Sequence, residues 1–429
     1  YASGLLALII GQASCQRSGN FHSANLRVEY LKEPMAVTAE QPRFSWEILA
    51  RQSGFVQSAY EIVLGADEKA VSKGRGDVWK SGLIKSSETN QIVYSGKKLK
   101  ANTTYFWKVR SWSQNKKSGN WSMPEAFHTG HNVETWQAKW IGMPVNLLEK
   151  KDYTIPPSPL MRKEFELKKP IRRAFFSASA KGVYEVFMNG KKIGDQVLAP
   201  GWTDYEQGIQ YQSYSVGNLM NSEKNCLSVI VSDGWYAGRL GTIDFGYKDF
   251  PWRGWYGRDL RFLGQLEIWY EDGTKETINT DESWSYNENG PFREADNFIG
   301  VTYDFNFEID GWMEPDFKDV EWSPVVAETP DYSILRAQID QPVKVIKELK
   351  AIGKTEPEKG IHVIDMGQNM VGWLKIKLKG QAGDTIRIFH GEMLKEDGQL
   401  YRQNLRNAPQ VETYILKDDK ESEIEPSLA

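Results

Sequence analysis

The sequence predicts an all-β protein made of three consecutive β-sandwich domains, and two observations lead to this fold class. From about Ser23 onward, short apolar runs alternate with turn residues, and few stretches carry the 3.6-residue period of a helix. Alternation with a period of two is common, most clearly in residues 374–379 and 385–390, which indicates half-buried strands. A length of 429 residues exceeds one ordinary domain. The predicted domains span residues 23–131, 132–338 and 339–429.

Composition and charge exclude several classes of protein. Hydrophobic residues make up 40% of the chain and charged residues 26%, as in soluble globular proteins rather than disordered ones. The formal net charge of −4 argues against a nucleic-acid binder, which usually carries a basic excess. Five histidines leave little room for a histidine-based metal site. The 16 tryptophans suit sandwich cores or sugar-stacking surfaces, and the core is the default for any single one.

Residues 1–22 have the pattern of a bacterial export signal. The apolar run at residues 5–10 is too short to span a bilayer but suits the centre of a signal peptide. Gln12-Ala-Ser-Cys15 resembles a lipoprotein signal, although Gln12 stands where leucine is usual, and ordinary cleavage near Ala13 is the alternative. Either way we expect export to the periplasm or the cell surface, with a membrane contact only through lipid on Cys15. Because the chain opens on Tyr1 without a basic segment, we expect its start to be truncated.

The first block, residues 23–131, resembles a fibronectin type III domain. Its segment from Leu99 to Tyr105 has the spacing of a tyrosine corner, in which a tyrosine hydroxyl ties a strand to the preceding turn. Trp46 and Trp107 are expected in the core. Such domains serve as spacers or adhesive modules, so this block does not point to one function.

The second block, residues 132–338, has the marks of a large antiparallel sandwich of the jelly-roll type. Asn189-Gly190 lies between apolar alternations and predicts a type I′ hairpin, whose two central residues need positive φ. Turn-rich motifs follow at Pro200-Gly-Trp-Thr-Asp-Tyr205 and Asp233-Gly-Trp-Tyr-Ala-Gly-Arg239. The strand that contains Cys226 is expected to be buried.

The third block, residues 339–429, combines strands with glycine turns and therefore predicts a further β-sandwich. Its most distinctive motif is Asp365-Met-Gly-Gln-Asn-Met-Val-Gly-Trp373. No obvious closing strand follows Glu425, so this sandwich is expected to be truncated at its C-terminal end.

Taken together, the motifs at 189–190, 200–205, 233–239 and 365–373 resemble the bacterial α-L-rhamnosidases, a family of glycoside hydrolases. The resemblance implies a fibronectin-like domain, a rhamnosidase N-terminal sandwich and a second, concanavalin-like sandwich. In the family an (α/α)6 barrel follows, and it carries the two carboxyl groups that hydrolyse terminal α-L-rhamnose with inversion. This chain ends where that barrel would begin, so it is predicted to be inactive alone. Its role would be to supply accessory and rhamnose-binding domains.

Two questions stay open at this point. A stand-alone carbohydrate-binding or adhesive surface lipoprotein is the alternative function. Family members frequently dimerise, and the sequence does not decide whether this chain forms a homodimer.

Acidic residues of the chain do not form a convincing catalytic pair, and no catalytic residue is assigned. His390 and Glu392 flank the end of an alternating strand, and the acidic pairs at 281–282 and 418–419 fall in charged loops. The sequence also carries no phosphate-binding loop after a strand, no Cys/His metal spacing and no serine-nucleophile elbow.

A binding site in the second block is a stronger candidate, because some relatives bind rhamnose there with the help of calcium. By that resemblance, Asp195 and Asp244 would supply oxygen ligands to the ion. Gln196 departs from the shorter amide expected beside Asp195, and simple turn chemistry at Asp195 is the alternative. The sugar would contact three residues of one loop, with a core position or an ion pair as their alternative roles. These residues are Trp235, Tyr236 and Arg239.

Overall fold

The computed structural model describes residues 21–51, 53–144, 156–239, 253–406, 408–425 and 428. The chain divides into two compact units, residues 1–130 and 131–429. The helices described are short: α1 (Glu68–Ser72) has five residues and α3 (Gly234–Ala237) has four, beside a few 3-10 turns. None is long and apolar enough to cross a membrane. The all-β fold class is confirmed, and the described residues contain no helical barrel.

The first unit is a two-sheet sandwich around an aromatic core. In its described residues, the sheets have the orders β1-β2-β5 and β4-β3-β6-β7. The strands are β1 (Phe21–Val28), β2 (Arg43–Ala50), β3 (Gln57–Gly65), β4 (Trp79–Lys80), β5 (Ile92–Val93), β6 (Thr104–Ser113) and β7 (Glu125–His128). Trp46 and Trp107 are buried, as predicted. The tyrosine corner is also present, because the Tyr105 hydroxyl accepts a hydrogen bond of 2.9 Å from the backbone N–H of Lys100.

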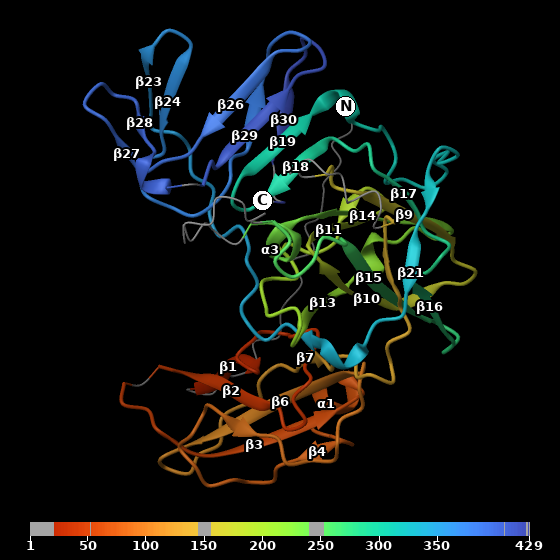
Figure 1. Cartoon of the computed structure of the whole chain (residues 1–429). Coiled ribbons are helices and arrows are strands. Elements are labelled where there is room, and N and C mark those ends of the chain that lie inside the picture. The colour runs from red at the N-terminus through yellow and green to blue at the C-terminus, as the bar shows by residue number, and fades with distance from the viewer. Residues whose placement is uncertain are drawn as a thin grey trace, which may run out of the picture. The chain divides into compact units, whose positions relative to one another are not determined.

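The second unit contains a large sandwich whose described strands form a seven-stranded and a six-stranded sheet (Figure 1). The seven-stranded sheet comprises β8 (Trp140–Gly142), β10 (Ile171–Lys181), β13 (Ile209–Ser215), β15 (Arg261–Tyr270), β16 (Lys275–Asn279), β21 (Val326–Glu328) and β22 (Leu335–Ala337). The six-stranded sheet comprises β9 (Leu160–Glu166), β11 (Val183–Met188), β12 (Lys191–Lys192), β14 (Lys224–Ser232), β17 (Ser285–Asn287) and β20 (Ser323–Pro324). Most of the buried side chains of these strands are apolar, and Cys226 on β14 is fully buried.

A third, mixed sheet joins segments that are far apart in the sequence. Its order is β18-β19-β29-β26, and Figure 1 shows these strands beside one another. Strands β18 (Phe292–Asp296) and β19 (Gly300–Asp304) come from the predicted second block, whereas β26 (Thr385–Phe389) and β29 (Val411–Ile415) come from the third. Strand β19 pairs in parallel with β29 over five residues. The two blocks are therefore connected by backbone hydrogen bonds.

The remaining strands of the third block form short two-stranded sheets. These are β23 (Gly353–Glu358) with β24 (Ile361–Asp365), β25 (Ile376–Leu378) with β30 (Ser422–Ile424), and β27 (Met393–Leu394) with β28 (Leu400–Tyr401). The predicted alternation on β26 holds, since Ile386 and Ile388 pack against a small core that contains Leu378 and Tyr414.

One buried guanidinium ties an interior strand of the six-stranded sheet to residues 312–319. The side chain of Arg162 on β9 is 2% exposed, and its Nε donates to the carbonyl of Trp312 at 2.9 Å. Its two terminal nitrogens donate to the carbonyl of Glu314 at 3.0 Å and to the carboxylate of Asp319 at 3.1 Å. Arg162 therefore satisfies polar groups that would otherwise be buried without a partner.

We predict that Arg162→Met lowers the free energy of unfolding by about 3 kcal/mol, because methionine fills the space but leaves these acceptors unpaired. Lys163→Met on the same strand is the control, since Lys163 faces the opposite side and pairs with Asp281 in a partly exposed position. Urea denaturation of both variants is the measurement. Equal losses of stability in the two would contradict the role given to Arg162.

Candidate functional site

A pocket of about 380 Å³ lies where the second and third blocks meet, beside the predicted ligand Asp195. Residues of the hairpin region line one side, and residues next to strands β25 and β30 line the other. The lining consists of Glu185, Lys192, Asp195, Val197, Val345, Trp373 and Glu425. The pocket therefore combines an aromatic ring, two aliphatic side chains and charges of both signs, which is the composition of many small-molecule sites.

The hairpin between β11 and β12 positions Asp195. Asn189 and Gly190 have φ values of 51° and 72°, so the predicted hairpin with two positive φ values is present. The Asn189 side chain also accepts from the backbone N–H of Cys226 at 2.8 Å, which ties the turn to β14. Gly194 has a φ of 77°, and a Cβ there would lie 2.4 Å from the Tyr214 ring. Glycine is therefore required directly before Asp195.

Charged groups of the pocket have hydrogen-bonding partners in the pocket or beside it. The Asp195 carboxylate lies 2.8 Å from the Lys344 ammonium, and Glu185 contacts Lys192. The Asp195 side chain is 71% exposed, so its ion pair contributes little to stability and can exchange partners at small cost. The indole N–H of Trp373 donates to Glu425 at 3.2 Å. Sugar hydroxyls both donate and accept hydrogen bonds, so they can bind to either member of such a pair.

The described residues around Asp195 contain no cluster of acidic side chains for the predicted calcium ion. Calcium takes six to eight oxygen ligands. Within the described ranges, no group of three or more His, Cys, Asp or Glu side chains is placed to hold a metal. Asp195 instead faces an ammonium, and Gln196 forms a backbone bridge with Lys344. Asp244, the second predicted ligand, lies outside the described residues, as does Cys15, so both assignments stay predictions.

The three residues predicted to contact sugar occupy different environments. Trp235 is half-buried against the core, and its ring is parallel to that of Trp202. Tyr236 is buried, and its hydroxyl donates to Asp259 at 2.6 Å. The backbone N–H of Arg239 donates to Asp296 at 2.8 Å. None of the three is among the described residues that line the Asp195 pocket.

A buried ion pair anchors the loop that carries Trp235. The Arg253 guanidinium donates two hydrogen bonds, of 2.5 and 2.6 Å, to the carboxylate of Asp233. Burial raises the pKa of Asp233 to about 6, although Arg253 lowers it. Asp296 adds a second anchor, because it accepts from the backbone N–H groups of Arg239 and Phe298.

The acidic residues considered for catalysis have structural partners. His390 lies 2.8 Å from Glu412, a residue that the sequence did not suggest, and not against Glu392. The hydroxyl of Tyr414 donates to the other oxygen of Glu412. Asp281 pairs with Lys163. These carboxylates lie in hydrogen-bonded pairs or on charged loops.

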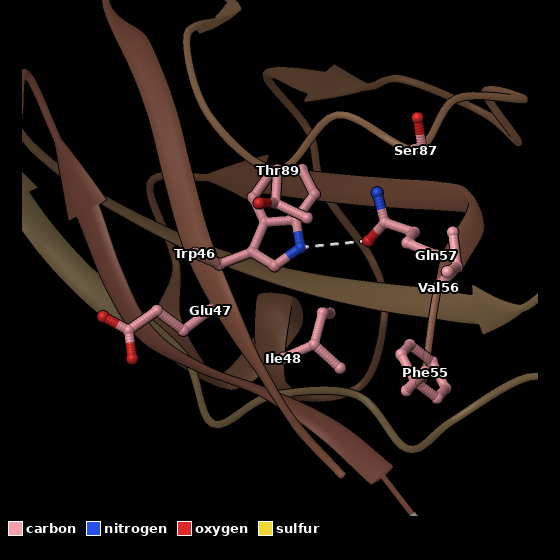
Figure 2. Close-up of a pocket in the computed structure, with 8 residues that line it drawn as sticks. All are labelled: Trp46, Glu47, Ile48, Phe55, Val56, Gln57, Ser87 and Thr89. Carbon is pink, nitrogen blue, oxygen red and sulfur yellow. Dashed lines mark hydrogen bonds between the residues drawn. The ribbon is translucent and has the colours of Figure 1, made fainter. Parts of the chain in front are cut away.

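A second hollow, of about 520 Å³, lies on the first unit (Figure 2). Figure 2 shows the indole nitrogen of Trp46 pointing to the side-chain oxygen of Gln57, a hydrogen bond of 3.1 Å. The Gln57 amide nitrogen donates to the carbonyls of Ser86 and Glu88. The polar groups of Trp46 and Gln57 are therefore already engaged within the first unit.

Comparison with known protein families assigns every block of the chain. Residues 23–132 match the family described as "Rha78A-like, N-terminal immunoglobulin domain". Residues 169–347 match "Alpha-L-rhamnosidase N-terminal domain", and residues 355–429 match "Bacterial alpha-L-rhamnosidase concanavalin-like domain". The chain belongs to the bacterial α-L-rhamnosidase family.

Individual rhamnosidases agree with this assignment along nearly the whole chain. An α-L-rhamnosidase of Alteromonas sp. (strain LOR) is 33% identical over 403 residues, which cover 92% of this chain and 42% of that protein. One of Formosa agariphila is 34% identical and covers 96% of this chain and 44% of that protein. The crystal structure of the Streptomyces avermitilis α-L-rhamnosidase complexed with L-rhamnose superposes with a TM-score of 0.86 at 27% identity, covering 95% of this chain and 55% of that one. The chain thus spans about half the length of these rhamnosidases.

Sequence reasoning missed most of the side chains that complete the Asp195 pocket. Lys344 and Trp373 are 149 and 178 residues further along the chain, and no local pattern connects them with Asp195. Trp373 is the last residue of the distinctive motif that begins at Asp365. The motif drew attention to Trp373 but did not indicate which residues lie beside it in space. The family resemblance pointed to the hairpin with Asp195, to the loop at 233–239 and to Asp244.

Proposed function

We propose that this chain supplies the accessory, sugar-binding domains of an α-L-rhamnosidase that hydrolyses terminal α-L-rhamnose with inversion, and that L-rhamnose binds in the Asp195 pocket. The family assignment supports the enzyme class. The single observation that supports the site is the juxtaposition of the Trp373 ring with the exposed Asp195–Lys344 pair. An aromatic ring can cover the apolar face of a sugar, while the charged pair binds its hydroxyls.

In this proposal the Lys344 ammonium, which pairs with Asp195 beside the pocket, takes the place of a metal cation. It lies within hydrogen-bond distance of both oxygens of Asp195, at 2.8 and 2.9 Å. A vicinal diol of rhamnose can accept from the ammonium and donate to the carboxylate at the same time. Binding then needs no metal ion, although calcium carried by the segment around Asp244 would change that requirement.

We expect isothermal titration with L-rhamnose to detect weak binding that Trp373→Ala or Asp195→Asn reduces at least about tenfold. Asp316→Asn is a matched control, because Asp316 is 68% exposed and pairs with Lys224 away from the pocket. A chelator should leave the affinity unchanged. Binding that is lost with the chelator would support calcium ligation through Asp244, and equal binding by the Asp195 and Asp316 variants would refute the pocket.

We further propose that the chain alone does not hydrolyse rhamnosides. Inverting hydrolysis needs a carboxylic acid with a raised pKa and a carboxylate base, facing each other across a cleft. In the second unit, burial raises the pKa of the Asp233 carboxyl group. This group is only 1% exposed, however, and it is bound by Arg253.

Assays with p-nitrophenyl α-L-rhamnoside between about pH 4 and 8 should therefore release no nitrophenol above a control without protein. Turnover that persists through repurification, and that disappears when one acidic residue of this chain is changed, would contradict the proposal. Such a result would locate an active site in one of the sandwiches.

Export with lipidation of Cys15 is also proposed, from the sequence of residues 1–22 alone. Palmitate labelling in a bacterial host should mark the wild-type chain and not Cys15→Ala, because the thiol is the acceptor. Equal labelling of the two, or none in either, would refute lipidation at this residue.

A further inference from the structure

A pair of tryptophans outside the Asp195 pocket has the features of a second sugar contact. Trp202 belongs to the 200–205 motif and Trp235 to α3, and their rings are parallel within 5° with centroids 6.4 Å apart. Trp202 is 54% exposed, whereas Trp235 is half-buried against the core. One ring is therefore presented to solvent and the other supports it.

The loop that carries Trp202 is held in one conformation by its own hydrogen bonds. The Gln212 side chain donates to the carbonyl of Pro200 at 3.0 Å, and the Tyr205 hydroxyl donates to the carbonyl of Gly201 at 3.2 Å. The Thr203 hydroxyl closes the loop by donating to the carbonyl of Gly208 at 2.6 Å. A ring on such a loop loses little conformational entropy when it binds a ligand.

The base of this loop is aromatic and buried. Tyr205 is 5% exposed, and its ring packs against those of Tyr236 and Tyr256 with centroids 5.2 and 5.0 Å away. Trp202 thus lies three residues from a well-packed cluster and still exposes more than half of its surface. A large ring that stays exposed on an ordered loop, beside a parallel second ring, is typical of a binding surface.

We propose that Trp202, supported by Trp235, stacks on the apolar face of a further sugar ring of the glycan whose rhamnose occupies the Asp195 pocket. This rests on the proposed function. A sugar is the favoured ligand because the exposed ring of Trp202 can present its face to the C–H groups of a sugar. Asp195 and Trp202 are seven residues apart, which limits their separation to about 25 Å of extended chain.

Affinities for L-rhamnose and for a rhamnose trisaccharide, measured by isothermal titration with the full chain, test this proposal. Trp202→Ala should weaken trisaccharide binding about tenfold and leave L-rhamnose binding unchanged, while Trp202→Phe should retain most of the affinity. Trp255→Ala is the matched control, because Trp255 is 70% exposed and neighbours the same cluster through Tyr256. This control should bind both sugars as the wild type does.

Four outcomes would overturn the inference. Unchanged trisaccharide binding by Trp202→Ala would refute the proposed stacking contact and would leave the proposed function intact. An equal loss of trisaccharide affinity in Trp255→Ala would show that the Trp202–Trp235 pair has no special role in binding. Loss of L-rhamnose binding in a folded Trp202→Ala would place this ring in the first pocket. If the wild type binds neither sugar, the proposed function fails and the second contact fails with it.

Discussion

The parallel pairing of β19 with β29 is the constraint on which the proposed pocket depends. Five consecutive residue pairs bind the second block to the third. Phe305, directly after β19, joins a core with Tyr414 on β29 and Leu378 on β25. Strand β25 pairs with β30, and the residues beside these two strands, Trp373 and Glu425, form one wall of the pocket. The pairing thus holds this wall against the second block, together with the backbone bridge between Gln196 and Lys344.

The charges of the site suit binding better than bond cleavage. In the pocket each acidic side chain has a nearby donor, and Asp195 exchanges partners easily because it is exposed. The contrasting group is Asp233, whose pKa is raised to about 6 by burial, a value suited to an acid catalyst. Its two hydrogen bonds from Arg253 instead make it an anchor for the loop that carries Trp235. A shifted pKa is therefore not sufficient evidence of catalysis, because access to a substrate is also required.

Local features of the fold could be predicted from the sequence, and long-range ones could not. The Asn189-Gly190 hairpin, the buried Trp46 and the tyrosine corner of Tyr105 each depend on residues close in the chain. The β19–β29 pairing joins segments about 110 residues apart, and no periodicity encodes which strands meet. For the same reason Asp195 was identified without Lys344, its partner. Trp235 was identified without Trp202, because the ring contact depends on how two loops pack.

A crystal structure of the chain with L-rhamnose would show whether the sugar binds in the Asp195 pocket. We expect one sugar in the Asp195 pocket, with its apolar face on the Trp373 ring and its hydroxyls within hydrogen-bond distance of Asp195 and Lys344. A sugar bound elsewhere with this pocket empty, at a concentration that saturates binding in solution, would contradict it.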